Sequence, residues 1–191
     1  MKDMESILSS ALATLYRGGT LLYPTDTIWG LGCDATDNAA VEKIYALKQR
    51  DHSKSMLVLC ADIAMVERFI SPVEDDVRSL LLEGNRPTTV IMPLHRALLA
   101  DNLAASDGTI GVRVPCMEFC QRLLQRLGKP VVSTSANLSG QPSPSSFSEI
   151  SPILLQSVDY CVPESCHRSG SPVPSRIVKR QPDGSFLTLR Q

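Results

Sequence analysis

The chain has 191 residues, of which 43% are hydrophobic and 20% are charged, as in an ordinary globular protein. Its 19 basic and 20 acidic residues leave a net charge of −1. This excludes the strong overall positive charge of many nucleic-acid-binding proteins, although a local basic patch stays open. There is no secretory signal and no run of about twenty apolar residues, so we expect a cytoplasmic protein without membrane contact.

The first half of the chain alternates helical periodicity with short apolar runs. Residues 3–17 predict a helix that two glycines end, and TLLY at 20–23 predicts a strand. Residues 24–37 predict a long structured turn, after which Asp37 or Asn38 caps a helix over 39–48. The next predicted elements are a strand at 56–60, a helical turn at 63–69, a helix at 73–82 and a strand at 90–92.

The second half continues the alternation after an irregular connection or short helix at 95–107. The predicted elements are a strand at 109–114, a helix at 117–127, a strand at 130–134, a loop at 141–148, a helix near 148–155, a strand at 158–162, a loop at 164–174, and a strand pair at 175–179 and 186–189 with a turn at 182–184. Strands and helices interleave without strict βαβ repetition. The predicted fold is therefore α/β, with an open, twisted, mixed β-sheet flanked by helices, in one domain over residues 1–191.

The six cysteines are scattered and lack paired CxxC spacing, which argues against a structural zinc site. We expect them to be small core residues. A metal cluster of Cys161, Cys166 and His167 is the weaker interpretation.

The stretch PVVSTSANLSG, residues 130–140, is a short apolar run that turns into hydroxyls and an amide. Ligand sites of open α/β sheets lie at the carboxyl ends of strands, so this stretch predicts a cup of hydrogen-bonding groups. The alternative is an ordinary Ser/Asn/Gly turn.

Three cations, Lys48, Arg50 and Lys54, fall within seven residues where a helix is expected to end. Such a cluster suits a multiply charged anion, since Arg offers a bidentate fork and Lys a mobile charge. The alternative is a solvated helix end, where cations also favour the helix dipole.

Arg113 lies inside the apolar strand TIGVRV, on the face that it shares with Gly111. An arginine inside such a strand needs a carboxylate, a phosphate or a water-filled cleft. An exposed edge or a structural ion pair stays open as the alternative.

The PTDT turn offers the Thr25 and Thr27 hydroxyls and the Asp26 carboxylate, which can bind a ligand or simply cap the turn. The chain has no GxxxxGK[ST] loop and no GxSxG motif, which excludes P-loop nucleotide enzymes and leaves serine hydrolases without support. The residues alone indicate one cleft with several cations and many hydroxyls. Such a cleft suits a phosphorylated or nucleotide ligand together with a small polar one.

Taken in order, these motifs resemble the threonylcarbamoyl-AMP synthase family, or YrdC-like domain, over nearly the whole chain. The matching segments are GGTLLYPTDTIWGLG at 18–32, the KxR element at 48–50, PTT at 87–89, TIGVRVP at 109–115, STSANLSG at 133–140 and SRIV at 175–178. Six motifs in this order and spacing are specific.

The resemblance implies a YrdC-like fold with a large, positively charged cleft and without the extra C-terminal domain of longer members. It also implies a reaction in which L-threonine, bicarbonate (or CO2) and ATP give threonylcarbamoyl-AMP and pyrophosphate. The product then serves a threonylcarbamoyl transferase machinery that modifies an adenosine of tRNA. Mg2+ would travel with ATP, and no protein-bound structural metal is expected. Direct contact with tRNA or double-stranded RNA is left open.

The resemblance also implies roles for individual residues. A catalytic quartet would surround the phosphates and the carbamate: Lys48, Arg50, Ser135 and Asn137. ATP would be bound by Arg50, Lys54, Thr109, Ser135, Ser143 and Arg190. Threonine would be held by Thr27, Arg113, Ser133 and Ser175, with Arg113 as the partner of its carboxylate.

This chain departs from the family pattern at segment 51–56, which lacks the usual prolines, and at Leu59 and Arg176. These departures keep open a YciO-like paralogue with weak or different activity. A non-catalytic RNA-binding module, motivated by the cation cluster with Lys179 and Arg180, is the alternative from another class of protein.

Overall fold

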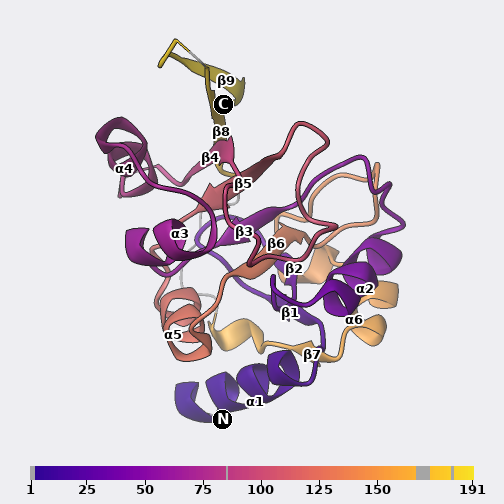
Figure 1. The fold of residues 1–191 in the computed structure, drawn as a ribbon. Coiled ribbons are helices and arrows are strands. Elements are labelled where there is room, and N and C mark those ends of the chain that lie inside the picture. The colour runs from indigo at the N-terminus through magenta and orange to yellow at the C-terminus, as the bar shows by residue number, and fades with distance from the viewer. Residues whose placement is uncertain (1–2, 85, 167–172, 182) are drawn as a thin grey trace.

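One nine-stranded mixed β-sheet, flanked by helices, organises the computed structural model, which describes residues 3–84, 86–166, 173–181 and 183–191 (Figure 1). The helices described are α1 (Met4–Tyr16), α2 (Asn38–Lys48), α3 (Ile63–Phe69), α4 (Asp75–Leu81), α5 (Glu118–Leu127) and α6 (Pro152–Ser157), with 3-10 turns η1 (Phe147–Glu149) and η2 (Glu164–Cys166). The strands are β1 (Leu21–Tyr23), β2 (Gly30–Gly32), β3 (Leu57–Leu59), β4 (Thr88–Pro93), β5 (Thr109–Arg113), β6 (Val131–Ser135), β7 (Tyr160–Cys161), β8 (Arg176–Arg180) and β9 (Phe186–Arg190). The predicted α/β class is confirmed.

The strands lie in the order β7-β1-β2-β6-β3-β5-β4-β8-β9. The pairs β1–β7, β3–β5 and β4–β8 are parallel, and the other neighbouring pairs are antiparallel. The sheet is therefore open and mixed, as the sequence predicts. Its last pair, β8 and β9, carries the C-terminus at the end of the molecule opposite α1 (Figure 1).

Helices cover both faces of the sheet, and two hydrophobic clusters fill the space beneath them. In the smaller cluster, α1 and α5 pack over strand residues such as Leu21, Leu59 and Val131. The larger cluster joins α2, α3, α4 and α6 to strand residues such as Leu22 and Val58. Neighbouring strand residues enter opposite clusters because successive side chains of a strand point to opposite faces.

The helix starts follow the expected chemistry. The Asp37 carboxylate caps α2 by accepting from the backbone N–H groups of Ala39 and Ala40 at 2.9 and 3.1 Å. Of the two predicted caps, Asp37 is therefore correct, and Asn38 is instead the first residue of the helix. Helix α2 ends at Lys48, and the next residue, Gln49, is its C-cap in a left-handed conformation with φ of 49°.

The long turn predicted at 24–37 is wrong in its middle, because residues 30–32 form β2 between β1 and β6. The segment GLG has little strand propensity of its own. Gly32 is nevertheless required, since a Cβ at this position would lie 2.1 Å from the carbonyl oxygen of Val132. Close approach of two backbones therefore decides this strand, and a local pattern does not reveal it.

Three further predictions are corrected by the structure. The helix expected near 148–155 begins later, at Pro152, because the Ser151 side chain caps it there and proline fits the first turn. The expected loop at 164–174 begins with η2. Cys116 is exposed, whereas four of the other cysteines are buried and Cys161 is half-buried.

Three predictions reach outside the described residues. The loop at 164–174 includes residues 167–172, the turn at 182–184 includes residue 182, and the alternative metal cluster includes residue 167. The irregular connection at 95–107 is confirmed as a series of turns. None of the described helices combines the length and the apolar character needed to cross a lipid bilayer.

Candidate functional site

A cleft of about 400 Å³ opens on the sheet face that also carries α1 and α5. Its floor is one row of side-chain positions across five neighbouring strands: Lys179 of β8, Ile91 of β4, Gly111 of β5, Leu57 of β3 and Ser133 of β6. Leu59, two residues beyond Leu57 on the same face, is already buried in the smaller cluster. The cleft thus begins where the helices stop covering this face.

Hydroxyl groups and cations line the cleft. The hydroxyl-bearing residues are Thr25, Thr27, Ser55, Thr89, Thr109, Ser133, Thr134, Ser135, Ser143 and Ser175. The charged lining residues are Arg50, Arg113, Lys179, Arg190 and Asp107. Four cations and one carboxylate suit an anionic ligand, and the positive charge expected of the cleft as a whole stays a prediction.

Arg113 is the most deeply enclosed of these cations, with 3% of its surface exposed. Its Nη1 donates to Oδ1 of Asp26, from the PTDT turn. The Asp26 carboxylate also accepts from the backbone N–H of Cys116 at 3.3 Å. The sequence left open whether Arg113 forms a structural ion pair or faces a cleft. Both interpretations are correct, because Arg113 pairs with Asp26 and also lines the cleft.

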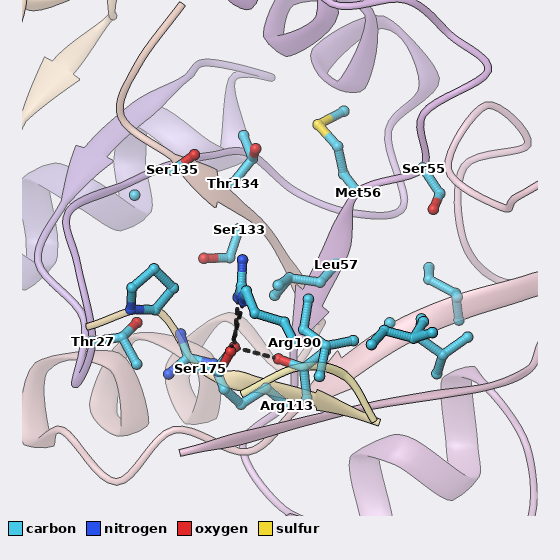
Figure 2. Close-up of a pocket in the computed structure, with 18 of the residues that line it drawn as sticks. Thr27, Ser55, Met56, Leu57, Arg113, Ser133, Thr134, Ser135, Ser175 and Arg190 are labelled. Carbon is cyan, nitrogen blue, oxygen red and sulfur yellow. Dashed lines mark hydrogen bonds between the residues drawn. The ribbon is translucent and has the colours of Figure 1, made fainter. Parts of the chain in front are cut away.

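A second arginine, Arg190 of β9, lies at the same end of the cleft (Figure 2). Its Nε donates to the carbonyl oxygen of Ser175 at 3.0 Å, and its Nη2 lies 3.3 Å from the Ser175 hydroxyl. That hydroxyl is 2.8 Å from the hydroxyl of Thr89. Burial and the charge of Arg113 lower the pKa of Arg190. An anion beside the two guanidinium groups would relieve their repulsion.

Arg50 lines the cleft from the segment that follows α2. Its Nε donates to the carbonyl oxygen of Lys54 at 3.0 Å, and its Nη2 donates to that of Ser55 at 2.8 Å. Burial lowers the pKa of Arg50, although an arginine stays charged at neutral pH. Arg50 therefore holds the segment 51–56 that follows it. Lys54 itself is exposed and is not among the residues that line the cleft.

Lys48 lies behind the cleft, with 1% of its surface exposed. Its ammonium donates to the carbonyl oxygens of Ser135 and Asn137 at 2.5 and 2.6 Å, and Oδ1 of Asn137 is 3.4 Å away. Burial, together with the charge of Arg50, lowers the pKa of Lys48 to about 8. The ammonium thereby ties the end of α2 to the loop after β6.

The implied quartet is thus divided by the structure. Arg50 and Ser135 line the cleft, whereas Lys48 and Asn137 do not. The Asn137 amide donates to the carbonyl oxygens of Leu138 and Gln141 at 3.1 and 2.6 Å, so it shapes the loop that presents Ser135. The remaining implied residues all line the cleft, apart from Lys54: Thr27, Thr109, Arg113, Ser133, Ser143, Ser175 and Arg190.

Three residues near the cleft have no place in the implied site. Asp107 accepts from Lys179 and from the hydroxyl of Thr109, each at 2.6 Å, and these bonds lower its pKa to about 2. Trp29 lines the cleft and packs against Phe147, with ring centroids 4.9 Å apart. Asp26 accepts a hydrogen bond from Arg113. The sequence indicated only that the PTDT turn carries this carboxylate, and did not predict the pairing. In the described part of the chain, no three His, Cys, Asp or Glu residues gather as metal ligands.

Known proteins resemble this chain in both sequence and fold. The family Sua5_yciO_yrdC, described as "Telomere recombination", matches residues 13–191. A protein of Idiomarina loihiensis named threonylcarbamoyl-AMP synthase is 34% identical over 181 residues, which cover 93% of this chain and 94% of that protein.

Two solved structures share the fold over the whole chain. The structure of E. coli YciO matches with a TM-score of 0.78 and 26% identity, and 91% of that chain is covered. The structure of P. abyssi Sua5 complexed with L-threonine matches with a TM-score of 0.84 and 22% identity. This chain spans 55% of that Sua5 chain, so the second match concerns the fold alone.

Proposed function

Because this chain belongs to the Sua5/YciO/YrdC family, we propose that it is an L-threonylcarbamoyladenylate synthase. It would join L-threonine, bicarbonate (or CO2) and ATP into threonylcarbamoyl-AMP, with release of pyrophosphate. The observation that supports this most directly is that one cleft holds Arg113 among hydroxyls and also holds Arg50 with Ser135. A small amino acid and a nucleotide could therefore bind side by side.

The amino-acid end would be formed by Arg113, Thr27, Ser133 and Ser175. Arginine suits the carboxylate of threonine because its planar fork matches the two oxygens. The hydroxyls can each donate and accept, so they suit the amine and the side-chain hydroxyl of threonine. P. abyssi Sua5, which shares this fold, forms a complex with L-threonine.

The nucleotide end would be formed by Arg50, Ser135, Ser143 and Thr109. The threonine nitrogen bonds to the carbon of CO2 and loses a proton, which gives a carbamate. A carbamate oxygen then bonds to the α-phosphorus of ATP as the bond from that phosphorus to the pyrophosphate oxygen breaks. The protein contributes position and charge rather than covalent chemistry, and Arg50 would stabilise charge on the phosphates. Mg2+ would enter with ATP as part of the substrate.

Lys48 and Asn137 would support this reaction from behind the cleft. They hold the end of β6, where Ser135 lies, and the loop that follows it, so their effect on the reaction would pass through Ser135. The product would then pass to a transferase machinery that acts on tRNA.

A direct assay tests the proposal. Purified protein is incubated with threonine, bicarbonate, Mg2+ and ATP, and pyrophosphate and the adenylate are measured with and without threonine. We expect Arg50→Ala to lower kcat/KM at least about tenfold, since a lost charged hydrogen bond is worth about 1.5–3 kcal/mol. Arg96→Ala is the control, because Arg96 is exposed and is not among the residues that line the cleft.

The outcome also separates the other candidate functions. Without threonine-dependent pyrophosphate release, while a working synthase is active in parallel, the proposal fails. Turnover with another amino acid would instead favour a YciO-like activity. The RNA-binding module loses part of its motivation, since Lys179 pairs with Asp107 and Arg180 pairs with Glu74.

A further inference from the structure

An ion pair inside the cleft, between Lys179 of β8 and Asp107, has no role in the proposed function. The Lys179 ammonium lies 2.6 Å from Oδ2 of Asp107. Both residues line the cleft, and 33% and 50% of their side-chain surfaces are exposed. Exposed ion pairs contribute little to the stability of a fold. Stability therefore gives little reason for this pair, and its place in the cleft points to the ligand.

The two partners of this pair are held unequally. Oδ1 of Asp107 accepts from the backbone N–H of Thr109 at 3.1 Å and from the Thr109 hydroxyl at 2.6 Å, so the carboxylate is fixed at the start of β5. Among the described residues, Asp107 alone accepts a hydrogen bond from the Lys179 ammonium. An ammonium carries three donors on a flexible stem. Lys179 is therefore the partner that can turn to a ligand, and it lies beside Thr109 at the nucleotide end.

Lys179 differs from the other cations that line the cleft. In the described part of the chain, Arg50 and Arg190 donate only to uncharged oxygens. Arg113 has a carboxylate partner that is buried with it. Lys179 has a carboxylate partner that stays exposed in the cleft, where a ligand can compete with it. The charge of Lys179 is thus available to a ligand with enough negative charge to replace Asp107.

We propose that Lys179 is a further phosphate-binding residue, whose ammonium passes from Asp107 to the polyphosphate tail of the nucleotide. The cleft would thereby select nucleoside triphosphates over monophosphates, because a single phosphate carries less charge to compete with the carboxylate. The adenylate product keeps one phosphate, so Lys179 would return to Asp107 after pyrophosphate leaves. The inference rests on the proposed function and deepens it, because it assigns a further contact and a selectivity at the nucleotide end.

The test measures calorimetric Kd values for ATP, AMP and inorganic tripolyphosphate at fixed Mg2+ and salt concentrations. We expect Lys179→Met to raise the Kd for ATP and for tripolyphosphate at least about tenfold, and the Kd for AMP less than about threefold. Asp107→Asn keeps an acceptor for Thr109 and removes the charge that competes with the ligand. It should lower the Kd for ATP at least about threefold, so the two single variants shift the affinity in opposite directions.

The double variant Asp107→Asn/Lys179→Met separates a phosphate contact from a structural role. It removes one positive and one negative charge, so the net charge of the cleft stays that of wild type. If the pair only supports the cleft wall, the double variant binds ATP like wild type. We expect its Kd for ATP to exceed the wild-type value at least about threefold, because the phosphate has lost a donor. Lys179→Arg keeps the cation and should stay close to wild type.

Arg180→Met is the matched control. Arg180 follows Lys179 on β8 and pairs with Glu74 at 2.5 Å, but it does not line the cleft. Successive side chains of a strand point to opposite faces. This variant loses the same charge and a similar ion pair, so it reports the effect of net charge and stability alone. We expect its Kd for ATP to stay within about twofold of wild type, because solvent and salt screen an exposed charge outside the cleft.

The outcomes keep this inference separate from the proposed function, since the titrations need no turnover. If threonine causes no pyrophosphate release but tripolyphosphate binding depends on Lys179, the inference is supported and the synthase proposal fails. If the protein is a synthase and Lys179→Met binds ATP like wild type, the proposed function stands and the inference is overturned. It is equally overturned if the double variant matches wild type, if ATP and AMP weaken equally, or if Arg180→Met weakens ATP as much as Lys179→Met does.

Discussion

The buried ammonium of Lys48 makes a quantitative prediction for the variant Lys48→Met. Methionine keeps most of the apolar stem and removes the donors to Ser135 and Asn137. The carbonyl oxygen of Ser135 keeps a bond from the backbone N–H of Asn137 at 2.9 Å. Among the described residues, Lys48 alone donates to the carbonyl oxygen of Asn137. Leaving one buried acceptor without a donor destabilises a fold by about 1–3 kcal/mol. We therefore expect the free energy of unfolding to fall by about 2 kcal/mol at neutral pH, which lowers Tm by roughly 4–8 °C.

The same residue makes the stability depend on pH in a defined direction. Burial and the charge of Arg50 lower the pKa of Lys48 from 10.5 to about 8. Between these values the unfolded chain binds more protons at Lys48 than the folded chain does, so wild-type stability rises with pH through this window. The free energy of unfolding rises by at most roughly 3 kcal/mol across this window. The oxygen acceptors around the ammonium limit the rise, because they favour its charged form. Lys48→Met lacks this pH-dependent rise in stability.

Urea unfolding, followed by the fluorescence of Trp29, measures the difference between wild type and variant from neutral pH to about pH 10.5. Taking the difference removes the groups that titrate equally in both proteins. Lys43→Met is the control, since Lys43 is exposed and donates to the carbonyl oxygen of Gly18 at 2.7 Å. Lys43→Met removes a lysine charge from the surface and so reports what the loss of such a charge does by itself. If the Lys48→Met difference changes with pH no more than the Lys43→Met difference does, the reasoning about the buried ammonium is refuted.

Two further predictions concern the fold. Gly32→Ala places a Cβ 2.1 Å from the carbonyl oxygen of Val132 and should destabilise the protein by more than about 3 kcal/mol. Gly84→Ala, with no heavy atom within 4 Å, should stay within about 0.5 kcal/mol of wild type; equal melting temperatures for the two variants would contradict the packing argument. Asp37→Ala removes the cap of α2 and should cost about 1 kcal/mol in urea unfolding, and an unchanged midpoint would show that the cap contributes nothing.

The chemistry of single segments was predictable from the sequence because it depends on neighbours in the chain. Helix α2 begins at Asp37, where a carboxylate reaches backbone N–H groups within the same turn. In β5, alternation places Gly111 and Arg113 on one face, and both line the cleft. The hydroxyl-rich end of β6 carries Ser133 and Ser135, and these line the same cleft.

Contacts between distant segments were decided only by the tertiary structure. Lys48 and Arg50 look alike in the sequence, yet the turn after α2 buries one behind the β6 loop and leaves the other in the cleft. Strand β2 exists because β1 and β6 offer hydrogen bonds on both sides of GLG. Asp26 lies 87 positions from Arg113 along the chain. Local patterns decide which segment can be a helix, a strand or a turn, but the pairing of buried polar groups depends on which segments meet in space.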